Sequence, residues 1–565
     1  MKKISILLLF SLLTSITITS FAQNEHYDTH PKFPHEATTI EKQLLPTWYQ
    51  HVRTSDPPAA PVNALAEFQP MGGVMIAYPL GIPVSLVSEL SFLTQVKVLV
   101  YPASDSNTVK NYFISSGVNM DNVSFWVINH DSYWTRDYGP WFIIDGNDEI
   151  GIVDFTYNRP QRVHDDAVLE TVVDLMGVER YDMPIVHTGG NYMVDGYGTA
   201  ASTDLVLEEN PNLTSSSILS YCHNYLGIDN YMLLNDPLGE YIAHIDCWGK
   251  FLDVDKVLIG QVSTYDNRYN DYEDIANTFA NAFTPWGNHY QVYRVFTPGG
   301  SYHKETPYTN SLILNDHVFV PTTGSQYDDQ AITAYQQAMP GYTIVPIRQS
   351  NNTPWENTDA LHCRTHELAD LGMLYIKHYP ILGEQNIPSS VTIETEIKAL
   401  SGQPLVTDSL LVYYRVNNGN WMSTPLQSVG GSTYQAQLSG FTAGDEVDYY
   451  IFAKDQSGRR ECHPYIGAAD PHHFSINSVG ITDHVIAEDA ITLYPNPCEN
   501  FCFVQSLQNN IVNITVYDIC GKLVFTDNAY SDKVSFNVSN WNAGVYTMTI
   551  TDSEGNTSHK KFIKR

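Results

Sequence analysis

Short apolar runs alternate with amphipathic helical patterns over more than half of the chain. Val74–Tyr78 and Val96–Val100 are typical of buried strands, whereas Ser85–Leu93 and Asp166–Leu175 repeat apolar residues at helical spacing. This alternation predicts an α/β domain, which we place at residues 61–385. Modules of similar size recur within it, but the sequence holds no repeat of fixed period.

The helical patterns stop near residue 386, and alternating strands separated by turn residues follow. They predict an immunoglobulin-like β-sandwich at residues 386–478. A last β module, at residues 485–565, opens with Leu493-Tyr494-Pro495-Asn496-Pro497 and closes with Gly544–Ile550. The strands expected in the sandwich are Val391–Thr395, Leu410–Val416, Thr433–Leu438 and Val447–Ile451.

The first residues predict export. Two lysines after Met1, an apolar run, and small residues before Gln23 are typical of a secretory signal peptide at residues 1–22, cleaved after Ala22. Residues 23–60 are polar, and we expect an irregular leader segment that packs on the catalytic domain. No later apolar run approaches the length of a transmembrane helix.

Charge and cysteine content narrow the class of protein. With 30 basic and 62 acidic residues the formal net charge is -32, which argues against nucleic acid as a partner and favours cationic substrates. Seven cysteines leave at least one unpaired. Cys498 and Cys502 are close enough in sequence to pair, and the other cysteines outside the candidate site are read as small buried side chains.

A thiol between two histidines is the strongest candidate for chemistry. Cys363 lies between His362 and His366, and a thiolate there is suited to covalent attack. His244 and Asp246 lie two apart in a segment that we expect to be a strand, which places both side chains on one face. Such a set suits a guanidinium, a planar cation whose N–H donors match carboxylates.

Each candidate also has a structural interpretation. His244 and Asp246 are equally compatible with a structural pair, Asp137 with an ion pair to Arg136, and Asn310 with a turn before a strand. Cys247 is a rival nucleophile, although strand alternation points it away from His244 and Asp246. His362 and His366 have the spacing of zinc ligands on a helix, but the glutamate expected after the first histidine is absent.

Several motifs together resemble the Porphyromonas-type peptidylarginine deiminases, within the guanidine-modifying enzymes. The resemblance runs from about residue 55 to residue 475 and is closer than that to agmatine deiminases in general. It rests on these segments: Ser132–Tyr138 around Trp134-Thr135-Arg136-Asp137, Thr188–Met193, Pro307–Leu314 around Asn310, Asp359–Glu367 around Cys363, and Lys377–Gln385.

The resemblance implies a five-bladed α/β propeller, hydrolysis of peptidyl arginine to citrulline and ammonia, and no cofactor or catalytic metal. It implies Cys363 as nucleophile, His244 as general acid and base, Asp137 and Asp246 as the guanidinium clamp, and Asn310 as support. The substrate-binding residues implied or expected are Trp134, Tyr241, Thr358, Arg159 and Arg162.

One position departs from the family pattern. Arg159 is implied to meet the free carboxylate of a C-terminal arginine, but the second arginine of the family, two residues later, is Gln161 here, with Arg162 next. The preference for C-terminal arginine is therefore expected to be less strict. The alternatives are a deiminase for free guanidines such as agmatine, and a catalytically silent surface adhesin.

The last module resembles the C-terminal sorting domain of the type nine secretion system. The resemblance covers about 75 residues, from the Leu493–Pro497 motif to the basic end at Lys560 and Lys561. It implies that the secretion machinery is a partner, and that the protein is exported through the periplasm and is secreted or attached to the outer-membrane surface.

Overall fold

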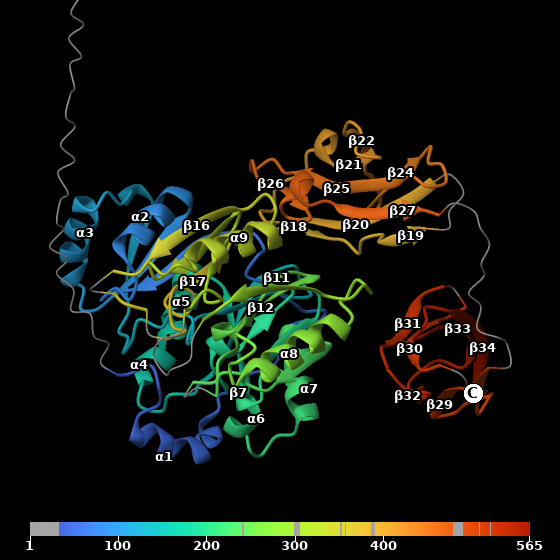
Figure 1. Ribbon diagram of the computed structural model, residues 1–565, viewed down its shortest axis with the longest axis horizontal. Coiled ribbons are helices and arrows are strands. Elements are labelled where there is room, and N and C mark those ends of the chain that lie inside the picture. The colour runs from blue at the N-terminus through green and yellow to red at the C-terminus, as the bar shows by residue number, and fades with distance from the viewer. Residues whose placement is uncertain are drawn as a thin grey trace, which may run out of the picture. The chain divides into compact units, whose positions relative to one another are not determined.

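The computed structural model (Figure 1) describes residues 33–239, 242–298, 306–350, 353–355, 357–385, 390–477, 490–507, 509–519 and 521–565. The expected signal peptide, Tyr241 and Cys520 lie outside these residues. The chain forms two compact units, one of residues 1–276 and 292–373 and one of residues 277–291 and 374–565. Among the described residues, no helix is both long and apolar enough to cross a membrane.

The first unit contains five small sheets with a common local order. In each of them an antiparallel pair of strands is followed along the chain by a helix and then by a further strand beside the second one. The further strand is parallel to its neighbour in the pairs β6 and β7, β9 and β10, β15 and β16, and β2 and β3. Parallel neighbours require a crossover connection such as a helix. The fifth sheet joins the two ends of the unit, because β17 pairs with β2.

The bounds of these elements follow, sheet by sheet. The strands are β1 (Asn63–Ala64), β5 (Trp141–Ile144), β6 (Ile150–Tyr157) and β7 (Glu179–His187); β8 (Met193–Val194), β9 (Thr199–Thr203) and β10 (Asn230–Leu234); β11 (Gly249–Asp253), β12 (Lys256–Gln261) and β13 (Gln291–Phe296); β14 (Leu312–Leu314), β15 (His317–Thr322) and β16 (Thr343–Arg348); β17 (His366–Ala369), β2 (Met71–Ala77), β3 (Gln95–Val100) and β4 (Val123–Val127). The helices are α1 (Thr39–Trp48), α2 (Val84–Leu93), α3 (Asp105–Ser115), α4 (Val163–Asp166), α5 (Val168–Met176), α6 (Leu205–Glu209), α7 (Ser215–Leu226), α8 (Tyr269–Asn281) and α9 (Asp328–Ala338), with short 3-10 turns η1 (Tyr49–His51), η2 (Met120–Asn122), η3 (Gly189–Asn191) and η4 (Ile245–Cys247).

Helix α5 shows how the sequence sets these elements. Its apolar residues Val168, Leu169, Val172 and Val173 are buried on one face, and the helix ends at Gly177, whose φ of 70° is left-handed. The strand and helix predictions quoted for this domain are confirmed at β2, β3, α2 and α5. The leader was expected to be irregular, and that was wrong, because residues 39–48 form α1, which lies against α6.

Five loops, each immediately before one strand of an antiparallel pair in its sheet, meet one another in a ring. They contain Asp137, Gly190, Asp246, Asn310 and Cys363 and precede β5, β8, β11, β14 and β17. The N–H of Gly189 donates to Asp137 O, η3 contacts η4, and the hydroxyl of Thr309 donates to Cys247 O. His362 N–H donates to Asn310 O, and Arg136 N–H donates to Cys363 O, which closes the ring. This ring brings together candidate residues that lie far apart in sequence.

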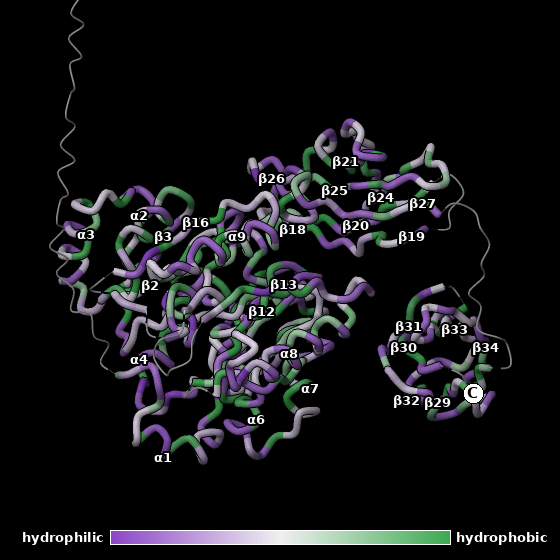
Figure 2. The backbone as a smooth tube through the Cα atoms, viewed as in Figure 1, coloured by the Kyte–Doolittle hydropathy of each residue, from purple (hydrophilic) through white to green (hydrophobic). Residues whose placement is uncertain are grey.

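The second unit is built from β-strands around two separate cores. Every second residue of β25, from Val447 to Ala453, is buried, as expected for a strand with one face on a core, and Figure 2 shows hydrophilic and hydrophobic residues interspersed along this unit. One core includes Ile393, Val412 and Tyr449, and the other includes Val504, Ile514 and Ile550. The four strands expected for the sandwich are confirmed at β20, β21, β24 and β25.

The elements of the second unit fall into four sheets. They are β18 (Leu374–Lys377), β20 (Ser390–Ala399), β24 (Thr433–Ser439) and β23 (Gln427–Gly430); β19 (Gly383–Gln385), β27 (His472–Ile476), β25 (Glu446–Lys454), β21 (Leu411–Val416) and β22 (Met422–Pro425), with β26 (Arg460–His463) on β25; β28 (Ile491–Tyr494), β29 (Phe501–Ser506) and β32 (Lys533–Asn537); β31 (Leu523–Asp527), β30 (Ile511–Tyr517), β33 (Gly544–Asp552) and β34 (Thr557–Lys564); and the short turns η5 (Thr407–Ser409) and η6 (Gly467–Ala469). Cys498 and Cys502, expected as a possible pair, are free thiols that hydrogen bond to each other.

Candidate active site

The Cys363 thiol lies on the ring of loops, fully buried and held by Asn310. Asn310 Nδ2 donates to the sulfur over 3.2 Å, and Asn310 Oδ1 accepts from the backbone N–H groups of Ala360, at 3.0 Å, and Cys363, at 3.2 Å. The sulfur also lies 3.5 Å from Asp246 Oδ2. The amide therefore fixes both the thiol and the turn that carries it, so Asn310 is more than a strand-entry residue.

His244 and Asp137 form a second buried pair on the ring. His244 Nδ1 lies 3.6 Å from Asp137 Oδ1, and neither side chain is exposed. Burial lowers the pKa of His244 to about 4, against the opposing charges of Asp137 and Asp246, so the imidazole is neutral near pH 7. Burial alone would raise the pKa of Asp137, but His244 and His35 hold it well below its ordinary value, which keeps the carboxylate ionised.

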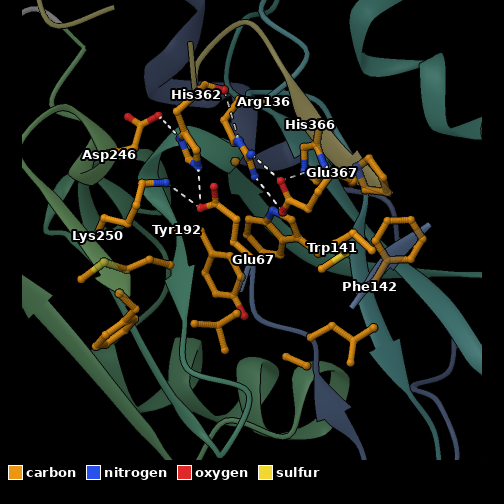
Figure 3. Close-up of a pocket in the computed structure, with 18 of the residues that line it drawn as sticks. Glu67, Arg136, Trp141, Phe142, Tyr192, Asp246, Lys250, His362, His366 and Glu367 are labelled. Carbon is orange, nitrogen blue, oxygen red and sulfur yellow. Dashed lines mark hydrogen bonds and ion pairs between the residues drawn. The ribbon is translucent and has the colours of Figure 1, made fainter. Parts of the chain in front are cut away.

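Asp246 is oriented by a chain of buried polar groups that Figure 3 shows. His362 Nδ1 lies 2.7 Å from Asp246 Oδ2, and its Nε2 lies 3.1 Å from Glu67 Oε2, which Lys250 Nζ approaches to 2.6 Å. Burial would raise the pKa of Asp246, but the hydrogen bond from His362 lowers it below its ordinary value. Asp246 is therefore also a carboxylate in this environment.

Two expectations about the segment around His244 were wrong. It is not a strand, because Ala243 has a φ of 48° and residues 245–247 form η4. The Cys247 side chain does not point away either: its thiol hydrogen bonds to the Cys363 sulfur and lies 3.7 Å from Asp246 Oδ1. The two candidate thiols are thus neighbours.

The ion pair considered for Arg136 and Asp137 does not form. Arg136 instead makes a two-pronged contact with Glu367, with Nη1 to Oε1 at 3.0 Å and Nη2 to Oε2 at 2.5 Å. Asp137 is left to face His244, Tyr157 Oη at 3.4 Å, and His35 Nε2 at 3.2 Å. His35 comes from the leader, so a residue outside the predicted site contacts one of its central groups.

Trp134 forms an apolar wall beside these carboxylates. Its indole N–H donates to Asp359 Oδ2 over 2.9 Å, and Arg364 neutralises Asp359 through Nε to Oδ1 at 2.8 Å. The ring is fully buried because the His35 imidazole stacks on it, with centroids 4.5 Å apart and an angle of 7°. Thr358, expected to bind substrate, is buried beside Asp359, and Tyr241 lies outside the described residues.

Arg159 and Arg162 both reach the same peptide carbonyl. Arg159 Nε and Nη2 each lie 3.4 Å from His35 O, and Arg162 Nη2 lies 3.3 Å from it. Gln161 accepts the hydroxyl of Thr38 over 2.6 Å. The departure from the family spacing therefore does not remove the second arginine from the site, because Arg162 takes part beside Arg159.

The thiol of Cys363 is protonated in this closed environment. Burial raises its pKa well above the ordinary value; the contact with Cys247 opposes the rise, and the charges of Asp246, Asp359 and Asp137 add to it. A cation placed among these carboxylates reverses the last effect, because it neutralises the charges that disfavour the thiolate. The arrangement is suited to a nucleophile that becomes reactive when a cationic substrate binds.

The two histidines considered as zinc ligands have other partners. His362 bonds Asp246 and Glu67, and His366 Nδ1 lies 2.7 Å from Glu367 O. Within the described part of the chain, a different group has the geometry for a metal: ligand atoms of His35, Asp137 and His244 lie within 4.8 Å of one another. The same arrangement fits a cationic side chain, since it places a carboxylate between two imidazoles.

Sequence patterns did not indicate His35, Glu67 or Lys250, and they gave no role to Asp359 and Glu367, which lie at the two ends of the motif around Cys363. Glu67 and Lys250 lie far from one another and from His362 in sequence, and no local spacing connects them. Thr38-Thr39-Ile40-Glu41 is the signature of a capping box and predicts the start of α1, although not where the helix binds. A cavity beside the site is lined by residues that include Glu67, Lys250 and His362 but not Cys363, Asp137 or His244.

Comparisons with known proteins identify two families in the chain. Residues 82–368 match the family described as Porphyromonas-type peptidyl-arginine deiminase, and residues 492–565 match the secretion system C-terminal sorting domain. The sorting domain indicates type IX secretion, so the protein is secreted or attached to the outer-membrane surface.

Several deiminases are similar to this chain. A putative agmatine deiminase of Legionella pneumophila (strain Paris) is 27% identical over 290 residues, 48% of this chain and 81% of the relative. An agmatine deiminase of Ectopseudomonas mendocina is 26% identical over 266 residues, 40% of this chain and 72% of the relative. A solved putative arginine deiminase from Porphyromonas gingivalis is 20% identical, with a TM-score of 0.48, and covers 54% of this chain and 98% of that one.

Proposed function

The chain belongs to the Porphyromonas-type peptidyl-arginine deiminase family, and we propose that it hydrolyses arginine in peptides to citrulline and ammonia, with C-terminal arginine preferred. One observation carries the choice of a peptide substrate. His35, a residue of the chain itself, already lies in the candidate site. Its side chain contacts Trp134 and Asp137, and its carbonyl lies between Arg159 and Arg162. An arginine in that position would place its own carboxylate between the two guanidinium groups.

The clamp in this proposal is formed by Asp137 and Asp246. Both are buried carboxylates whose pKa values lie below the ordinary value, and both interact electrostatically with His244. A guanidinium that binds between them would exchange its hydrogen bonds to water for hydrogen bonds to two carboxylates at fixed positions. In this proposal Trp134 contacts the apolar stem or the planar guanidinium face of the substrate arginine, in the place where the ring of His35 lies now.

The proposed reaction is covalent and uses no cofactor or metal. As the cation enters, His244 takes the proton of the Cys363 thiol, and the thiolate forms a C–S bond with the guanidinium carbon. His244 returns the proton to a terminal nitrogen, the C–N bond breaks and ammonia leaves. Water then attacks the thiouronium carbon and gives one proton to His244; the C–S bond breaks, the second proton goes to the sulfur, and citrulline is released. His244 loses its proton to solvent, where the ammonia takes it up, and is neutral again for the next turnover.

The wider architecture is part of the proposal. Five sheets of one local order and five loops joined in a ring support a five-bladed pseudo-symmetric α/β propeller for residues 61–385. We assign residues 386–478 to an immunoglobulin-like domain, residues 485–565 to the sorting domain, and residues 1–22 to a signal peptide. An experimental structure of the protein tests these assignments.

Agmatine is the second candidate substrate, because the named relatives are agmatine deiminases. Agmatine lacks a carboxylate, so it leaves the carbonyl-binding arginines unused. The test measures ureido product from a peptide ending in arginine, from the same peptide ending in arginine amide, and from agmatine. Peptide turnover with the free carboxylate favoured supports the proposal; turnover of agmatine alone contradicts it, and no product from any of them, either with the wild type or with a His35→Ala variant, indicates a silent binding protein.

The identity of the nucleophile is tested by a matched pair of variants. Cys363→Ala should abolish product from every substrate, whereas Cys247→Ala should retain turnover, because Cys247 contacts the Cys363 sulfur but forms no bond to the substrate in the proposed reaction. Both variants remove one buried thiol from the same place, so a general effect on folding would appear in both. Activity retained in Cys363→Ala and lost in Cys247→Ala would transfer the role to Cys247.

A further inference from the structure

Residues 33–41, which we call the occluding segment, cover the candidate active site of their own chain. Cys363, His244 and Asp137 are each 0% exposed, and a peptide arginine has no access to buried groups. The occluding segment contacts this site at Asp137, Trp134, Arg159 and Arg162. The chain as it stands is therefore closed to the reaction proposed for it.

His35 occupies the position that a substrate side chain requires. Its ring stacks on Trp134, its Nε2 lies 3.2 Å from Asp137 Oδ2, and its Nδ1 lies 3.5 Å from Asp359 Oδ2. The same ring packs edge-on against His244 at 5.9 Å between centroids. A planar, nitrogen-bearing ring between two carboxylates and on an indole shares the main features of a bound guanidinium.

The backbone of the occluding segment is held as well. Arg162 Nη2 donates to the carbonyls of Pro34 at 2.5 Å, His35 at 3.3 Å and Glu36 at 3.1 Å. Its Nε lies 3.4 Å from the buried carboxylate of Glu41. Both arginines expected to recognise substrate are thus engaged by this segment, so it and a substrate exclude each other.

Helix α1 explains why the segment keeps this shape. Thr38 and Glu41 form a capping box that fixes the turn between His35 and the helix. Beyond the helix, Trp48 Nε1 donates to Tyr157 O over 2.9 Å, and Arg53 Nη1 contacts Asp166 Oδ2 at 2.5 Å. The segment is therefore anchored on its C-terminal side next to the site that it fills.

We propose that the occluding segment is an internal pseudo-substrate inhibitor, with His35 in the guanidinium position, and that the deiminase is latent until this segment is displaced or removed. A tethered ligand acts at an effective concentration on the order of millimolar, so external substrate competes poorly with it. Apparent substrate affinity falls in proportion to the fraction of molecules in which the segment has left the site.

Full-length protein with His35→Ala tests the proposal, and Lys42→Ala is the matched control. Lys42 directly follows the segment in α1, and its exposed side chain pairs with the exposed Glu36 rather than with the site. Two readouts are compared: kcat/KM for a peptide ending in arginine, and the rate at which iodoacetamide alkylates Cys363, followed by peptide mass spectrometry. We expect His35→Ala to raise both by about tenfold or more, which corresponds to a decrease of about 1.4 kcal/mol in the free energy that favours the closed state. Lys42→Ala should change neither.

The two readouts separate this inference from the proposed function, on which its activity part rests. Faster alkylation in His35→Ala without ureido product from any guanidine supports occlusion and contradicts the proposed function. Deiminase activity in the wild type that is unchanged in His35→Ala, with unchanged alkylation, overturns occlusion alone. Lower activity in His35→Ala also overturns it, because His35 would then belong to the catalytic machinery.

A synthetic peptide of residues 33–44 provides the complementary measurement. Added to His35→Ala protein, it should inhibit competitively with the arginine peptide and slow alkylation of Cys363, while the same peptide with alanine in place of histidine should inhibit at least several-fold less. Equal inhibition by the two peptides would contradict the role given to the imidazole.

Discussion

Asp137 and Asp246 are both buried carboxylates, yet different partners keep them charged. His244 and His35 stabilise the charge of Asp137, and His362 stabilises that of Asp246. As the proposed clamp, each supplies charged acceptors to a desolvated cation, and such hydrogen bonds are worth roughly 1.5–3 kcal/mol or more when buried. Asp137→Asn and Asp246→Asn should therefore each lower kcat/KM by at least ~100-fold.

The measurement is best made in the His35→Ala background, where occlusion does not limit turnover. Circular dichroism and the unfolding midpoint should show that both variants keep the fold. If both lose less than about tenfold, or ~1.4 kcal/mol, these carboxylates do not clamp the guanidinium.

Glu209 gives a prediction about pH. It is buried, accepts from Asn158 Nδ2 over 2.5 Å, and burial raises its pKa to about 8. The unfolded chain ionises this group near pH 4 to 5, while the folded chain keeps it protonated, so its contribution to stability is full at low pH and is lost progressively up to about pH 8. Glu209→Gln cannot ionise and should flatten this fall.

Denaturant unfolding of wild type and Glu209→Gln at about pH 5 and about pH 8 checks the sign. The variant should gain stability relative to wild type at the higher pH, by on the order of a few kcal/mol. The same transition must be compared in each case, because the chain has several cores. An identical pH dependence in the two proteins would show that Glu209 ionises freely in the fold.

The group of His35, Asp137 and His244 allows a test of metal dependence. Its ligand atoms lie within 4.8 Å of one another, but in the proposed mechanism these groups serve the cation and the proton. Treatment with EDTA followed by desalting should leave kcat/KM unchanged. Loss of activity that a divalent metal restores would instead identify a metal as part of the active enzyme.

At the scale of elements, the loop before β8 leaves no room for a side chain at Gly190. A Cβ on Gly190 would lie 2.6 Å from His244 Nδ1 and 2.8 Å from Asp137 Oδ1. Gly190→Ala should therefore separate these side chains and lower activity at least ~10-fold, since small misplacements at a reacting centre are costly. Gly249→Ala is the control, because its Cβ would meet the flexible end of Ile259 at 3.3 Å and Ile245 at ordinary contact distances of 3.7 and 3.9 Å.

The expected signature of Gly190→Ala is a fall in kcat with near-normal unfolding behaviour. Loss of activity in both glycine variants to the same degree would point to a general disturbance of the ring of loops. Full activity in Gly190→Ala would mean that His244 and Asp137 tolerate displacement, contrary to their proposed roles.

Local pattern was sufficient for most of the elements but not for the segment around His244. Period-two alternation in Ile242–Asp246 looks like a strand, and nothing in that stretch announces the left-handed backbone at Ala243, whose carbonyl is held by Thr203 forty residues earlier. The error in the position of Cys247 follows from the same cause. A turn whose geometry depends on a residue distant in sequence cannot be predicted from the local alternation of polar and apolar residues.

The same difference between local motifs and tertiary contacts explains which residues of the site were predicted. Asp137, His244, Asp246, Asn310 and Cys363 were found because each lies in a distinctive local motif, and the structure brings them together. Glu67 and Lys250 were missed because their role depends on contact with His362 across the fold. The helix at residues 39–48 was missed although Thr38 and Glu41 form a capping box, and the contact of Glu41 with Arg162 is a tertiary one that no local pattern contains.

For the whole molecule, the dominant property is charge. The formal net charge of -32 comes from 62 acidic against 30 basic residues, and a field of this sign attracts cations at a distance. Arg159 and Arg162 are local exceptions at the candidate site, where they face a carbonyl rather than solvent. The acidic field of the whole molecule should therefore favour peptides with basic residues, whereas Arg159 and Arg162 should select the carboxylate at the end of the same peptide.

We predict that residues upstream of a C-terminal arginine affect turnover through this field. Peptides that differ only in two lysines or two glutamates before the arginine should differ in kcat/KM by about tenfold at low salt, lysine being favoured, because attraction speeds encounter. At about 0.5 M salt, where screening shortens the reach of surface charge to a few ångströms, the ratio should fall to about threefold or less. The comparison uses His35→Ala protein, so that opening of the site is not limiting. A ratio that does not change with salt would mean that upstream residues are recognised by direct contact, and that the acidic surface serves solubility alone.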